Sequence, residues 1–122
     1  MRYAALFVLL FAACTTSPTP TGAVCPTADA PTYANFGKHF MMTYCTSCHA
    51  SDATDRHGAP RDDNFDSEAG VRDHADEIDQ IAAKGPKAMN TDMPDLSGMV
   101  KQEPTEVERE KLGQFLACMK TQ

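Results

Sequence analysis

The chain has 122 residues, which is enough for one small domain. Its 17 acidic residues outnumber its 11 Lys and Arg residues, and the formal net charge of −6 argues against nucleic acid as a partner. Only 7% of the residues are aromatic and Trp is absent, so a domain of this size would have a thin apolar core by itself. We therefore expect a single acidic domain whose core needs a further apolar component.

The N-terminal end of the chain has the pattern of an export signal. One positive charge, Arg2, precedes an apolar run over residues 3–13, which is too short to span a bilayer but typical of a secretory signal. The sequence Phe-Ala-Ala before Cys14 resembles a bacterial lipobox, with Phe where Leu is usual. We predict a lipoprotein-type signal peptide over 1–13, cleaved before Cys14, and a lipid on Cys14 that anchors the periplasmic chain to a membrane surface. An ordinary signal peptide, cut near Ala13 or further on, is the alternative.

Residues 14–31 are the predicted tether between this signal and a domain over residues 32–122. The segment 15–24 is rich in Thr, Pro and Ser, so we expect it to be extended or disordered. Cleavage would remove Arg2 and leave 10 basic against 17 acidic residues, a net charge of −7.

Three helices are predicted in the domain, and no segment alternates like a strand. The first covers residues 32–45, with apolar side chains every three or four positions, and Gly37 in its interior predicts the close approach of another helix. The second covers 68–84 and ends at a Gly-Pro pair. The third covers 105–120 and begins with a capping-box sequence. The fold is predicted to be all-α.

The rest of the domain is predicted as loop and solvated surface. Residues 50–66 are polar, and residues 85–103 contain glycines, prolines and three methionines, so both segments are expected to be loops. The second helix carries an acidic run that we expect on its solvated face: Asp73, Asp76, Glu77 and Asp79.

One motif carries chemistry. Residues 45–49 read C-x-x-C-H, the attachment sequence for a c-type haem. The thiols of Cys45 and Cys48 lie on one side of a helical turn, where they can add to the two vinyl groups of one porphyrin. The imidazole of His49 follows directly and can ligate the iron. One covalent haem c would also supply the missing apolar mass. A zinc site is a poor alternative, because no second ligand pair is evident.

The five cysteines can be assigned by counting. Cys14 is assigned to lipid, and Cys45 and Cys48 to haem. Cys25 and Cys118 remain, and in an oxidising compartment this pair is expected to form a disulfide. The alternative is two unpaired thiols.

Residues 32–120 resemble a class I (monohaem) cytochrome c. Members of this family have a helix leading into C-x-x-C-H, a Met-Pro ligand loop and a closing helix that packs across the first. Gly37 fits the glycine of the first helix, Met93-Pro94 resembles the ligand loop, and Gly113 is a candidate for the small residue at the helix crossing. Phe is usual where this chain has Met41.

The resemblance also implies an axial ligand set. His49 would be the proximal ligand and Met93 the distal one, and the carbonyl of Pro60 would accept the Nδ1–H of His49. Other methionines are expected to fill the core, and His39 and His57 to be solvated. Three further side chains compete with Met93 as distal ligand: Met89, Met99 and His74.

Two arginines close to Pro60 are candidates for contact with the haem. Arg56 and Arg61 would pair with the negative propionates. Alternatively, they pair with neighbouring acidic residues at the surface: Asp52, Asp55, Asp62 and Asp63.

The predicted function is one-electron transfer, with no bond-making chemistry and no small-molecule substrate. Other redox proteins would dock at an exposed haem edge in small, transient encounters. The first alternative is a thiol–disulfide oxidoreductase that uses Cys45 and Cys48, although a thioredoxin-like version needs strands. The second is a haem-based sensor or a subunit of a larger redox complex.

Overall fold

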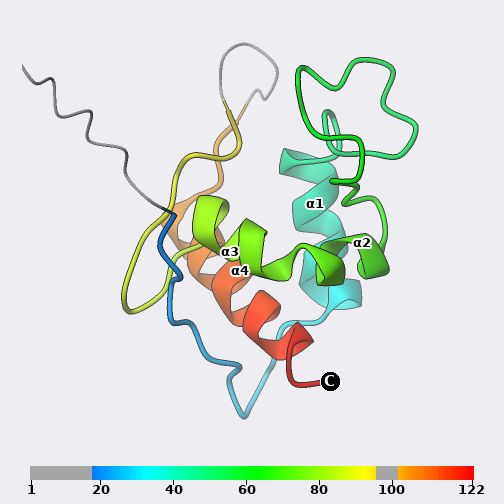
Figure 1. The fold of residues 1–122 in the computed structure, drawn as a ribbon. Helices are drawn as coiled ribbons and strands as arrows, with labels where there is room; N and C mark the ends of the chain where they lie inside the picture. The colour runs from blue at the N-terminus through cyan, green and yellow to red at the C-terminus, as the bar shows by residue number, and fades with distance from the viewer. Residues whose placement is uncertain (1–17, 96–101) are drawn as a thin grey trace, which may run out of the picture.

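The computed structural model describes residues 18–95 and 102–122, and within these ranges the chain is helical, without strands. An isolated bridge joins Lys84 and Met89. None of the helices in the described ranges has the length and apolar character needed to cross a bilayer. The predicted lipidation site, Cys14, lies outside the described residues, and so does Met99. The elements in chain order are a π-helical turn η1 (Tyr33–Gly37), α1 (Lys38–Tyr44), α2 (Glu68–Asp73), α3 (Ala75–Ala82) and α4 (Glu106–Met119) (Figure 1).

The first predicted helix is confirmed, although it begins with a π-helical turn. Thr32 caps η1 through a reciprocal capping box with Asn35. The predicted close approach at Gly37 is also confirmed, because a Cβ there would lie 2.4 Å from Cζ of Phe115 in α4. Gly113 does not serve this crossing. A Cβ at Gly113 would meet the backbone oxygen of Lys84 instead, at 2.5 Å.

The second predicted helix is broken into α2 and α3. The break is at His74, whose φ of −108° and ψ of 15° lie outside the helical region. Apolar periodicity continues across the break, since Val71, Ala75 and Ile78 are all buried, so the sequence pattern alone does not reveal it.

The last helix, α4, begins where the capping box predicts. The Thr105 hydroxyl accepts from the backbone N–H of Glu108, and the Glu108 carboxylate accepts from the backbone N–H of Thr105. The hydroxyl of Tyr44 donates to the same carboxylate, 3.0 Å away, so the cap also joins α1 to α4.

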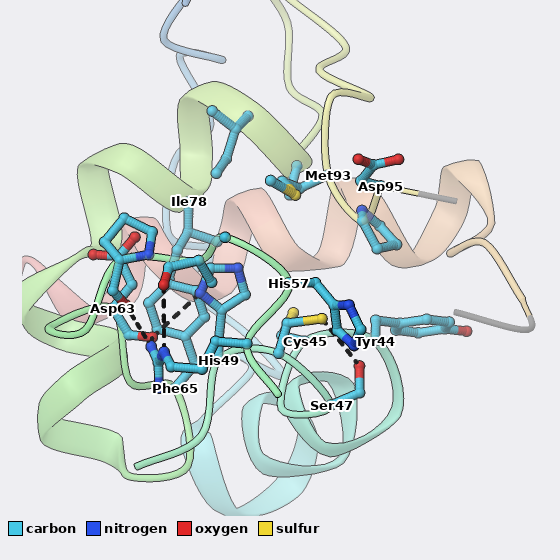
Figure 2. Close-up of a pocket in the computed structure, with 18 of the residues that line it drawn as sticks. Tyr44, Cys45, Ser47, His49, His57, Asp63, Phe65, Ile78, Met93 and Asp95 are labelled. Carbon is cyan, nitrogen blue, oxygen red and sulfur yellow. Dashed lines mark hydrogen bonds between the residues drawn. The ribbon is translucent and has the colours of Figure 1, made fainter. Parts of the chain in front are cut away.

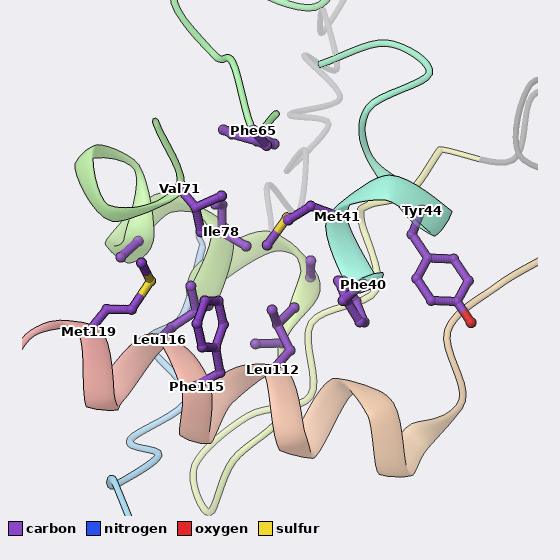
Figure 3. Packing of buried hydrophobic residues seen from close by; sticks show 13 residues of the cluster. Phe40, Met41, Tyr44, Phe65, Val71, Ile78, Leu112, Phe115, Leu116 and Met119 are labelled. Carbon is purple, nitrogen blue, oxygen red and sulfur yellow. The ribbon is translucent and has the colours of Figure 1, made fainter. Parts of the chain in front are cut away.

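The core lies between α1, α3 and α4, as Figure 3 shows. Leu112, Phe115 and Leu116 of α4 are almost fully buried against it. Burial of such side chains stabilises the fold by about 1.5–3 kcal/mol each. The other members of the cluster are Phe40, Met41, Tyr44, Phe65, Val71, Ala75, Ile78, Ala82, Ala83 and Met119.

The N-terminal segment is held more firmly than its composition suggests. Thr21 is fully buried, and its backbone N–H and hydroxyl both donate to the carboxylate of Asp79, at 2.8 and 2.5 Å. Asp79 is therefore buried on α3 and not on its solvated face, which corrects the expectation for this residue. The predicted disulfide is confirmed: Cys25 and Cys118 are joined, with an Sγ–Sγ distance of 1.97 Å.

Candidate functional site

A cavity of about 260 Å³ lies beside the end of α1. Its wall is formed by segments far apart in the chain: the C-x-x-C-H motif, the loop that follows it, the last turns of α3, and the residues around Met93. Figure 2 shows Met93 and His49 on opposite sides of this pocket. The aliphatic part of the wall comes from Ile78, Ile81 and Ala82.

The C-x-x-C-H motif continues α1 as a turn. The backbone N–H groups of Cys48 and His49 both donate to the carbonyl of Cys45, at 3.2 and 2.9 Å. This turn places both thiols and the imidazole on the pocket wall. Cys45 and Cys48 are free thiols. The sequence-predicted motif residues therefore face one cavity.

The surroundings of Cys45 do not favour a thiolate. Burial raises the pKa of this thiol to about 12, although the positive charge of Arg109 acts in the opposite direction. A thiol with so high a pKa is protonated at neutral pH and is a weak nucleophile. This argues against a thiol–disulfide oxidoreductase that uses Cys45 for attack.

His49 is buried and is oriented from two sides. Its Nδ1 lies 3.2 Å from the backbone oxygen of Asp63, and its ring stacks on Phe65 with a centroid distance of 4.6 Å. Burial lowers the pKa of the imidazole, while the contacts with Asp63 act in the opposite direction. A neutral imidazole whose Nδ1–H is engaged by a carbonyl leaves Nε2 as the ligand atom.

The acceptor at Nδ1 was expected to be Pro60, and this was wrong. The Pro60 carbonyl instead accepts from Nη2 of Arg56 and from the backbone N–H of Asp63. The chain turns between Pro60 and Asp63, and this turn brings the later carbonyl to His49. Pro60 remains part of the pocket wall.

Arg56 organises the loop after the motif. Its guanidinium donates to the backbone oxygens of Ala50, Pro60 and Asp63, at 2.5, 2.5 and 2.9 Å. It also donates to the side chain of Asn64, and it lines the pocket. Neither of the two roles expected for Arg56, a pair with a haem propionate or a pair with a neighbouring aspartate, included these hydrogen bonds. Arg61 is exposed and does not line the pocket.

The candidate distal ligands separate clearly in space. Met93 lines the pocket, with 36% of its surface exposed. Met89 is 54% exposed and lies outside the pocket wall. His74 also lies outside it, behind Phe65, with a ring-centroid distance of 5.7 Å. His57 is exposed, as expected, and it also lines the pocket.

Arg109 is a buried residue that sequence reasoning missed. It is 3% exposed, and its Nη1 donates to the carbonyls of Ala82, Asn90 and Met93, at 2.7, 3.1 and 2.8 Å. Arg109 thereby fastens the segment before Met93 to α4 and to the end of α3. The sequence carries only a weak signal for it, an arginine three residues before Leu112 on the inward face of the helix.

The fold and the pocket thus define an all-α domain in which a Cys/Cys/His motif and a methionine face one cavity. Neither protein-family models, curated proteins nor solved structures match this chain.

Proposed function

We propose that this protein is a monohaem c-type cytochrome that transfers single electrons. The observation that carries the proposal is the meeting of the motif with Met93 on one pocket, although Met93 follows His49 by 44 residues (93 − 49). Thiol, imidazole and thioether are the side chains that hold haem c through its vinyl groups and its iron.

The residues present fit this group. Cys45 and Cys48 would hold the porphyrin covalently, and His49 and Met93 would be the axial ligands. The iron would supply one-electron redox chemistry, and the thioether would favour its ferrous state relative to a second imidazole. The pocket is smaller than the roughly 300–1,000 Å³ usual for ligand sites, so a macrocycle would fill it and leave an edge outside.

The protein's own residues would keep this site dry and fixed. The carbonyl of Asp63 and the ring of Phe65 hold the imidazole of His49 in one orientation. Arg109 holds the backbone of Met93 from the other side. Preorganised ligands reduce the rearrangement that a change of charge would otherwise cause. The exposed edge would then be the place where redox partners dock, in transient encounters.

Export belongs to the same proposal. Haem attachment to Cys45 and Cys48, the disulfide at Cys25 and Cys118, and a lipid at Cys14 all suit an oxidising compartment outside the cytoplasm. We infer a periplasmic protein that is anchored to a membrane through lipid on Cys14.

A denaturing gel stained for haem, together with a visible spectrum, tests the proposal. The wild-type chain, expressed with a cytochrome maturation system, should retain haem after denaturation and show sharp α and β bands when reduced. Replacement of both Cys45 and Cys48 by Ser should abolish the covalent haem, whereas Met42→Ser, an exposed change on α1, should not. A colourless wild-type protein with a redox-active dithiol would instead support an oxidoreductase.

A further inference from the structure

A second group of metal-ligating side chains lies outside the Cys/Cys/His motif, and two of its members, Asp63 and Glu77, line the same pocket. Asp63, His74 and Glu77 each offer one ligand atom, and these atoms lie within 4.8 Å of one another. Nδ1 of His74 is 3.7 Å from Oδ1 of Asp63 and 3.3 Å from Oε2 of Glu77. The break between α2 and α3 places this imidazole opposite the loop that carries Asp63.

The carboxylate of Asp63 pairs with the imidazole of His74, between α2 and α3. Its side chain is only 10% exposed, and its Oδ1 lies 3.7 Å from Nδ1 of His74, which is beyond hydrogen-bond distance. A buried carboxylate usually accepts hydrogen bonds or binds a cation. The Asp63 backbone is fully used, because its carbonyl faces both His49 and Arg56. Its side chain offers one oxygen within 4.8 Å of the ligand atoms of His74 and Glu77.

The separations match those of a tetrahedral zinc site. Two ligands about 2.1 Å from Zn²⁺ lie about 3.4 Å apart at the tetrahedral angle. The two distances from Nδ1 of His74 bracket this value. Glu77 is half-exposed and can close the remaining separation by a change of rotamer. An imidazole with two carboxylates favours zinc over calcium or magnesium, which prefer oxygen ligands alone.

We infer that Asp63, His74 and Glu77 form a zinc-binding site, with water as the fourth ligand. The ion would tie the loop after the C-x-x-C-H motif to the start of α3. This inference goes beyond the proposed function and does not depend on it.

Calorimetric titration with Zn²⁺ tests the site in the purified full chain. The Cys45→Ser/Cys48→Ser background comes first, because two thiols beside His49 could bind zinc themselves. In this background, His74→Gln should weaken zinc binding by more than about tenfold, since even the loss of an outer-shell partner costs 10–100-fold. His39→Gln, a change at an exposed histidine on α1, should bind zinc like its parent. Zinc should also raise the melting temperature of the parent and of His39→Gln, but not that of His74→Gln.

Two further comparisons keep the test decisive if the double background folds poorly. The same His74→Gln and His39→Gln pair is titrated in the wild-type chain as isolated. Glu77→Gln adds a change at an exposed residue that is not part of the core cluster. Saturable binding that His74→Gln and Glu77→Gln both weaken supports the site. Absence of saturable binding, or equal affinity of His74→Gln and His39→Gln, overturns it. A colourless protein that binds zinc here would refute the haem proposal and leave the zinc site supported.

Discussion

Arg109 allows the sharpest test of how the pocket is held together. We consider Arg109→Met, which keeps much of the apolar stem but removes the guanidinium. Nη1 faces three carbonyls, and its two N–H groups can make two good bonds at a time. Two charge-assisted hydrogen bonds contribute about 3–6 kcal/mol together. Because removal of the buried charge recovers part of its desolvation cost, we expect a loss near the lower limit, about 3 kcal/mol.

Urea denaturation followed by far-ultraviolet circular dichroism measures this loss. The matched control is Lys38→Met, because Lys38 is an exposed cation on α1 without a side-chain partner in the described part of the chain. Such a surface change should stay within about 0.5 kcal/mol of wild type. A loss of about 3 kcal/mol is a large part of the roughly 5–15 kcal/mol that stabilises a domain.

The result that would refute this reasoning is a small difference between the two variants. If Arg109→Met and Lys38→Met differ by less than about 1 kcal/mol, the contacts of Arg109 do not hold the segment before Met93. In the haem-loaded protein, Arg109→Met should also weaken the sulfur-to-iron charge-transfer band at urea concentrations below global unfolding. Retention of that band up to global unfolding would show that Met93 is held without Arg109.

Three more predictions address the ligand, the disulfide and the helix cap. Met93→Ala should abolish the sulfur-to-iron charge-transfer band of the oxidised protein, whereas Met89→Ala should leave it intact, and loss of the band only in Met89→Ala would reverse the ligand assignment. Cys25→Ser should lower the free energy of unfolding by about 4–5 kcal/mol, because the bond closes a loop of 93 residues, and an unchanged midpoint in urea would contradict this. The backbone N–H of Thr105 donates a hydrogen bond to Glu108, and this bond is the main cause that lowers the pKa of the carboxyl. The stability that this interaction contributes is therefore present above the usual pKa of Glu and is lost as the pH falls through the lower pKa of the folded state. Glu108→Gln should therefore destabilise the protein at neutral pH but not in acid, and a pH-independent difference would contradict the linkage.

Predictions from the sequence were correct where the interactions that control the structure join residues close together in the chain. The capping box at Thr105 and the periodic apolar residues of α4 involve neighbours three or four positions apart, and the helix begins where they predict. Gly37 signalled a close approach because glycine in a helix interior has a cost that packing must offset. Counting thiols identified the pair Cys25 and Cys118, because these two remained once the other three cysteines had been assigned to lipid and haem.

Contacts between distant segments were harder to foresee. Asp79 looked like part of a solvated acidic face, but Thr21, far away in the chain, folds over it and donates two hydrogen bonds. Pro60 looked like the acceptor for His49, but the turn after it presents the carbonyl of Asp63 instead. Composition cannot report such contacts, because it does not specify where a loop returns to the core.

The chain's local patterns are thus sufficient for its all-α class, the start of α4 and the position of its Cys/Cys/His motif. These features depend on hydrogen bonds and periodicity within one or two turns. Tertiary structure was needed to bring Met93 to the pocket that the motif lines, to bury Arg109 against the backbone of Met93 and to break the second helix at His74. Each of these depends on many weak contacts between segments far apart in the chain, and their sum is defined only when the whole domain is packed.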